Sequence, residues 1–201
     1  AYVEEKVVAW RIDTGPNAAV TPGKNNPDVE YFGGLYRNGY LTAMDPLHVS
    51  DAVDENKTAG GGIFLTAPSV TKESATVQAQ TDVKNEGEQA QDTTVKTEIV
   101  DDDGGVVATK EDTTTIAAGE SHAFVQKLVV ENPRLWSINT PELYTVRTTV
   151  LTGDTVRDSL ETTYGIRKVE WKRDGCYING EYVELNGTNM QSEIGMLGNA
   201  Q

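Results

Sequence analysis

The 201-residue sequence predicts an all-β protein, and three observations support that prediction. Apolar side chains alternate with polar ones along several segments, which is the two-residue period of a half-buried strand. Short turn signals rich in Gly, Asp and Asn separate these segments. Apolar spacing of three to four residues, which marks an amphipathic helix, is nearly absent. We therefore expect sheets that pack face to face around one core.

The strand pattern is strongest between residues 61 and 166. Residues 75–83 alternate small apolar and polar side chains, and residues 94–100 repeat this pattern with Val95, Thr97 and Ile99 facing inward. Asp and Gly at 102–105 predict a turn. Further strands are expected at residues 106–109, 121–130, 143–151 and 155–164, with 121–130 as a central strand. About seven strands in roughly 110 residues are typical of an immunoglobulin-like sandwich.

The first 50 residues have a different pattern. Strands are predicted at residues 7–12, 29–36 and 39–43, but two or three strands cannot bury a core alone. They need a partner surface, so we expect them to dock on the sandwich or to pair with another copy of the chain, as a homo-oligomer. Residues 51–62 are polar and Gly-rich, which predicts a linker.

The last 37 residues contain the strongest turn signal. Residues 177–178 and 182–185 flank Asn179-Gly180, and a type I′ hairpin turn needs positive φ at both of its central residues. After Asn186-Gly187 the pattern becomes irregular. The segment is therefore interpreted as the start of a new structural unit within a larger protein.

Charge and composition exclude several classes of partner. The formal net charge is -14, which opposes binding to nucleic acid, so no nucleic-acid partner is expected. No apolar run approaches the ~18 residues of a transmembrane helix, so no membrane insertion is expected. Cys176 is the single cysteine, and an intrachain disulfide is therefore excluded. His48 and His122 lie far apart in sequence, which disfavours a zinc site.

Three motifs occur in a fixed order along the chain. They are YFGGLYR at residues 31–37, NPRLWS at 132–137 with PELY at 141–144, and YGIRKV at 164–169 with YING at 177–180 and LNGTN at 185–189. In this order and at this spacing they resemble glycoside hydrolase family 2, in particular its β-galactosidases. The resemblance covers nearly the whole chain.

The resemblance implies three domains. Residues 1–56 correspond to the last strands of a jelly-roll, sugar-binding-like domain, residues 57–167 to an immunoglobulin-like sandwich, and residues 168–201 to a hairpin and strand that lead into a (β/α)8 barrel. The implied parent enzyme hydrolyses terminal β-galactosides with retention, in the periplasm or outside the cell. The alternative is an independent immunoglobulin-like module of a surface protein that binds carbohydrate or protein.

The resemblance also bears on the site residues. Retaining glycosidases use two carboxylates about 5–5.5 Å apart, and in this family both come from barrel strands, so no catalytic residue is expected in the chain. Substrate contacts in the parent are implied for Asp28 and Asn189, and Gln191 stands where the family usually has a His that faces the sugar. No cofactor is expected in the chain itself. In the parent Na or Mg is expected, with Asp28 as the candidate sodium ligand.

Structural roles are expected for Gly34, Arg37, Trp136, Tyr144 and Arg167. Trp136 and Tyr144 offer large apolar faces suited to closing one end of a sandwich, and sugar stacking is the alternative for Trp136. Gly34 permits a bulge or a close backbone approach. The two arginines are expected to bind carboxylates or carbonyls. The acidic run at residues 101–103 is interpreted as a solvated hairpin tip.

Overall fold

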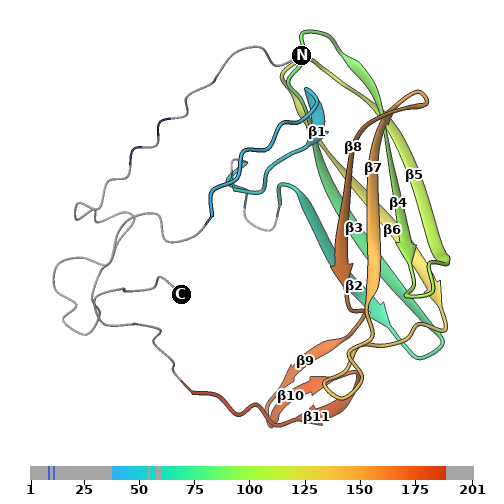
Figure 1. Cartoon of the computed structure of the whole chain (residues 1–201). Helices are drawn as coiled ribbons and strands as arrows, with labels where there is room; N and C mark the ends of the chain where they lie inside the picture. Colours follow the sequence, from blue (N-terminus) through green and yellow to red (C-terminus); the bar gives the residue numbers. More distant parts are fainter. Residues whose placement is uncertain (1–8, 10, 12–37, 54, 58–59, 189–201) are drawn as a thin grey trace. The chain divides into compact units, whose positions relative to one another are not determined.

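A computed structural model of the chain describes residues 9, 11, 38–53, 55–57 and 60–188. The described residues form eleven strands and no helix, which confirms the all-β prediction (Figure 1). The chain divides into two compact units, one of which spans Ala43–Asn186 and holds all eleven strands. No helix within the described part is long and apolar enough to cross a membrane.

The first sheet is organised by β3 (Ser74–Asn85). Along one flank β3 pairs antiparallel with β6 (Ser121–Glu131). Along its other flank β3 pairs first with β2 (Ile63–Val70) and then, through its last three residues, with β1 (Leu47–Val49). The prediction of a central strand at 121–130 is wrong, because β6 lies at the edge of this sheet and buries only alternate residues.

The second sheet has the order β5-β4-β7-β8 and is antiparallel throughout. Its strands are β4 (Gln91–Val100), β5 (Val106–Ile116), β7 (Tyr144–Thr152) and β8 (Thr155–Tyr164). The strand expected at 106–109 continues to Ile116, which pairs with Gln91. The charged residues at 110–112 hid this extension, because an edge strand can carry polar side chains on both faces.

The two sheets bury one another's inner faces. Between residues 61 and 166 they contain seven strands, β2 to β8, as the sequence predicts for the sandwich (Figure 1). Val77, Ile99 and Val146 are fully buried in one apolar cluster, and Val83, Val95 and Val150 are fully buried in another. The inward residues of β3, β4 and β7 are therefore those that the two-residue alternation predicts.

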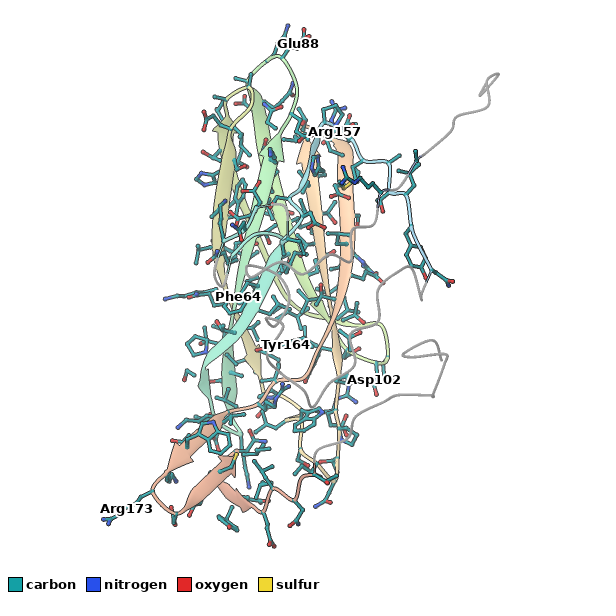
Figure 2. The ribbon with its side chains drawn as sticks, turned by 90° about the vertical axis from the view of Figure 1, so that its left-hand side faces the viewer. Phe64, Glu88, Asp102, Arg157, Tyr164 and Arg173 are labelled. Carbon is teal, nitrogen blue, oxygen red and sulfur yellow. The ribbon has the colours of Figure 1, made fainter. Side chains whose placement is uncertain are left out.

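A small third sheet follows the sandwich. It consists of β9 (Val169–Lys172), β10 (Gly175–Ile178) and β11 (Glu181–Val183), in the order β11-β10-β9. Asn179 and Gly180 have φ of 51° and 85°, so the predicted hairpin with positive φ at both turn residues is confirmed. Figure 2 shows Arg173, at the β9–β10 turn, at the opposite end of this unit from Glu88, in the loop between β3 and β4.

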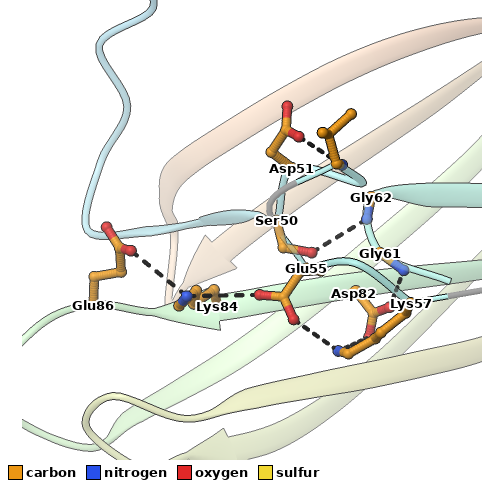
Figure 3. Close-up of polar contacts among 10 residues, drawn as sticks. Ser50, Asp51, Glu55, Lys57, Gly61, Gly62, Asp82, Lys84 and Glu86 are labelled. Carbon is orange, nitrogen blue, oxygen red and sulfur yellow. Dashed lines mark hydrogen bonds and ion pairs between the residues drawn. The ribbon is translucent and has the colours of Figure 1, made fainter. Parts of the chain in front are cut away.

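The predicted linker at 51–62 is instead a loop fixed to the first sheet (Figure 3). It joins β1 to β2 within that sheet, and its Gly61 N–H donates to the buried carboxylate of Asp82 at 2.6 Å. Lys57 also contacts Asp82, at 3.7 Å, and Lys84 contacts Glu55 at 3.6 Å. Gly61, which indicated flexibility, instead allows the loop to pack closely on itself, since a Cβ on Gly61 would lie 3.0 Å from Ala52 Cα in the same loop.

The remaining N-terminal predictions are mostly untested. The described part of the segment 39–43 has no strand, so that prediction is wrong. The strands predicted at 7–12 and 29–36 fall outside the described residues, apart from positions 9 and 11. The domain boundaries at 56 and 167 stay predictions, although β1, which lies within 1–56, pairs with the sandwich strand β3.

Candidate functional site

The loop between β6 and β7 closes the end of the sandwich that faces the small sheet. Asn132 begins it with φ of 46°, and its N–H donates to Glu73 O at 2.7 Å. Tyr144, which is 4% exposed, accepts a hydrogen bond from the Arg134 N–H on its hydroxyl at 2.8 Å. The second motif thus folds back on itself, because its last residue binds its backbone ten residues earlier.

Trp136, in this loop, contacts the segment that follows β8. The backbone N–H of Trp136 donates to Ile166 O at 2.9 Å. A Cβ on Gly165 would lie only 2.8 Å from Cδ1 of the Trp136 ring. The Arg167 guanidinium carbon stands 4.9 Å from the ring centroid, which is cation–π distance. Arg167 also donates to Gly165 O at 3.0 Å. The indole is therefore held between backbone on one side and a cation on another.

Asn179 connects the small sheet to the β6–β7 loop through the oxygen and the nitrogen of its side-chain amide. Its Nδ2 donates to Trp136 O at 2.9 Å, and its Oδ1 accepts from the Lys168 N–H at 2.9 Å. Its own N–H donates to Lys168 O at 2.8 Å. We call the set Trp136, Gly165, Arg167, Lys168 and Asn179 the junction. It fixes how the small sheet leaves the sandwich.

A cavity of about 500 Å³ adjoins the junction. Its wall includes the β2–β3 turn at 70–72, Leu135, Ile178 and the ion pair of Lys168 with Glu170, which is 3.0 Å long. The hydrogen bond from Lys168 holds the pKa of Glu170 below its ordinary value. Glu170 is therefore ionised at neutral pH, whereas a general acid needs a raised pKa.

The acidic run at 101–103 forms the β4–β5 turn. Its three carboxylates bring oxygens within 4.8 Å of one another, and Asp102 and Asp103 are exposed. Asp101 Oδ1 accepts from the N–H groups of Asp103 and Gly105, and Asp102 pairs with Arg134. The Arg134 guanidinium holds the pKa of Asp102 below its ordinary value. The carboxylate of Asp101 therefore holds the turn, and that of Asp102 binds the neighbouring β6–β7 loop.

The structure brings together two of the residues singled out from sequence. Trp136 and Arg167 are in contact, and Tyr144 reaches the same loop through Arg134. Asp28, Gly34, Arg37, Asn189 and Gln191 lie outside the described residues, so their roles, and the sodium site at Asp28, stay predictions.

Sequence reasoning missed three contributors to this end of the sandwich. Asn179 was recognised only as a turn residue, Gly165 only as part of a motif, and the Arg134–Asp102 pair not at all. The hydrogen bond from the Asn179 side chain to Trp136 O spans 43 residues of sequence, so no local pattern could indicate it.

Comparison with known proteins gives one family match. The family model for glycosyl hydrolases family 2 matches residues 62–167, which run from the residue before β2 to the junction residue Arg167. The matched segment therefore contains β2 to β8, which are the seven strands of the sandwich.

Several relatives are similar over most of the chain. A β-glucuronidase from Formosa agariphila is 33% identical over 156 residues, covering 77% of the chain and 16% of the relative. A β-galactosidase from Bacteroides ovatus is 31% identical over 200 residues, covering 98% of the chain and 21% of the relative. The crystal structure of a Bacteroides uniformis β-glucuronidase, 28% identical, matches 94% of the chain and 22% of its own length with a TM-score of 0.78. The chain thus spans about a fifth of these proteins.

Proposed function

Because the chain belongs to glycosyl hydrolases family 2, we propose that it serves as the immunoglobulin-like sandwich, with its flanking segments, of a glycosidase that cleaves β-galactosides or β-glucuronides. The observation that carries this proposal is the match of the family model to residues 62–167, the segment that contains β2 to β8. Its role is to space and orient the neighbouring parts of the enzyme through the junction.

Two substrate classes are proposed because the relatives divide between them. The relative from Bacteroides ovatus, 31% identical over 98% of the chain, is a β-galactosidase, and this favours a β-galactoside. The relative from Formosa agariphila, 33% identical over 77% of the chain, is a β-glucuronidase, and this favours a β-glucuronide. A β-glucuronide carries a carboxylate that a β-galactoside lacks, so the two classes are separable by assay.

The catalytic carboxylates are proposed to lie elsewhere in the polypeptide. A glycosidase that retains configuration needs one carboxylic acid with a raised pKa and one carboxylate about 5–5.5 Å away. Glu170 pairs with the junction residue Lys168, and Asp102 pairs with Arg134 of the β6–β7 loop. These cations lower the pKa of both acids. Asp28, Asn189 and Gln191 are proposed as sugar contacts, and Na or Mg as the ion of the intact enzyme.

Hydrolysis of p-nitrophenyl β-galactoside and p-nitrophenyl β-glucuronide tests this proposal. The 201-residue chain is compared with the same polypeptide continued by roughly 300 residues, enough for a TIM barrel. We expect the longer protein to turn over one of the two substrates and the 201-residue chain to turn over neither. Turnover by the 201-residue chain would show that it carries its own catalytic pair. Failure of the longer protein on both substrates would contradict the proposed substrate classes.

A further inference from the structure

Four buried polar side chains face inward between the two sheets of the sandwich. Thr81 lies on β3, Gln126 on β6, Thr97 on β4 and Thr148 on β7. Three of them are fully buried, and Gln126 is 1% exposed. Polar groups at such depth are normally hydrogen-bonded, because burying an unbonded polar group is unfavourable.

These four residues lie where the two apolar clusters meet. In the second sheet Thr97 pairs with Thr148. In the first sheet Gln126 pairs with Ala79 and Thr81 pairs with Phe124, so Thr81 and Gln126 are diagonal neighbours. Each of the four is flanked, two positions away along its strand, by one member of each apolar cluster, so each marks the boundary between the clusters. The flanking pairs are Ala79 and Val83 around Thr81, Ile99 and Val95 around Thr97, Leu128 and Phe124 around Gln126, and Val146 and Val150 around Thr148. We call the four residues the polar layer. It separates the two apolar clusters across both sheets.

Half of the polar layer is satisfied by protein groups. Thr97 Oγ1 donates to Gln126 Oε1 at 2.6 Å, which joins the two sheets. Gln126 Nε2 donates to Val95 O at 3.0 Å and to Lys110 O at 3.5 Å. Both amide hydrogens of Gln126 are therefore engaged, while its Oε1 keeps one lone pair.

The other half of the polar layer has no such partner. Thr81 Oγ1 and Thr148 Oγ1 are buried and form no hydrogen bond with any described residue. They come from opposite sheets, β3 and β7, and each lies between a member of one apolar cluster and a member of the other. Each hydroxyl can donate one hydrogen bond and accept two. The layer thus presents two free hydroxyls and one free carbonyl lone pair.

We propose that the polar layer binds an internal water molecule that joins Thr81 Oγ1 and Thr148 Oγ1 to Gln126 Oε1. A buried water typically makes about three hydrogen bonds to groups that are otherwise unsatisfied, and these three atoms supply that number. Water fits better than an ion, because the four side chains of the layer carry no charge. The water links the two sheets at the boundary between their apolar clusters.

Isosteric substitutions distinguish a hydrated layer from a dry one. In the 201-residue chain, T81V and T148V each remove a water ligand, and each is expected to lower the thermal midpoint by about 2–4 °C. The double variant is expected to lose less than the sum, because both changes act on the same water. T149V, on the neighbouring residue of β7 that faces away from the core, is the matched control and is expected to leave the midpoint unchanged.

A rise in midpoint for T81V or T148V would overturn the proposal, since it would mean that a buried hydroxyl without a partner had been removed. A crystal structure at high resolution provides the direct readout. The expected result is a water within hydrogen-bond distance of both hydroxyls in the unmodified chain and its loss in T81V/T148V. Two hydroxyls that bind protein carbonyls with no water between them would contradict the proposal.

Discussion

The backbone N–H of Val49 donates to Asp158 Oδ2 at 2.9 Å, although 109 residues separate the two in sequence. Val49 ends β1, which pairs with β3 in the first sheet, whereas Asp158 lies on β8 in the second. The register of β7 and β8 shifts between Val150 and Leu151, which pair with Asp158 and Val156. Arg157 is therefore an extra residue on β8 with no partner on β7. Arg157 contacts Asp45 at 3.5 Å, just before β1. This β-bulge therefore ties β1 to the opposite sheet.

Removal of the Asp158 carboxylate tests that tie. D158A leaves the Val49 N–H without its acceptor, and we expect a loss of about 1–3 kcal/mol in the free energy of unfolding. Urea unfolding measures it, with D154A in the exposed β7–β8 turn as the control of equal charge change. Equal midpoints for D158A and D154A would show that the tie contributes nothing to stability.

Gly165 is predicted to tolerate no side chain. A Cβ there would lie 2.8 Å from Trp136 Cδ1 and 2.9 Å from Trp136 Cβ, so G165A forces the indole or the backbone to move. Overpacking of this kind costs about 1–3 kcal/mol, which chemical denaturation would detect. G187A is the matched control, because a Cβ on Gly187 would meet nothing within 4 Å. If G165A lost no more stability than G187A, the close approach to Trp136 would not be a constraint.

The sandwich strands could be predicted from sequence where burial alternates. On β3, β4 and β7 every second residue faces the core, so the apolar period alone located the strands and their inward residues. The same alternation holds on β6, but the apolar residues Val125 and Val129 on its exposed face made it resemble a central strand. Exposure at a sheet edge depends on which strands pair, and the local sequence does not determine it.

The loop contacts could not be predicted, because they depend on distant residues. The segment 51–62 has the composition of a linker, yet Asp82 and Lys84 on β3 fix it to the sheet. The same holds at the junction, where the family motifs located Trp136 and Arg167 but gave no sign of Asn179 as their link to the small sheet. Asp28, Asn189 and Gln191, which the resemblance assigns to the sugar, fall outside the described residues and stay predictions.

Asn179 is predicted to hold the small sheet on the sandwich. N179G keeps a residue suited to positive φ at the turn but removes both side-chain hydrogen bonds, to Trp136 O and from Lys168 N. We expect a loss of about 1–3 kcal/mol, measured as faster hydrogen exchange of the Lys168 amide. Exchange within β3 is expected to stay unchanged. N139G, in the exposed loop after Trp136, provides the control, and equal exchange at Lys168 in both variants would contradict this role.

The Asp102–Arg134 pair predicts a loss of stability in acid. Arg134 holds the pKa of Asp102 below its usual 3.8, so folding favours the ionised carboxylate. The contribution is therefore fully present above pH 3.8 and is lost as the pH falls through the lowered value of the folded state. We expect the thermal midpoint of the unmodified chain to exceed that of D102N at pH 6, and this difference to shrink below pH 3.8. D103N is the control, because Asp103 has no ion pair within the described part of the chain.

Salt at 1 M is expected to reduce the difference in thermal midpoint between the unmodified chain and D102N at pH 6, since the Asp102–Arg134 pair is exposed. A difference that stayed constant from pH 6 down to the acid range would show that the pair does not couple to folding.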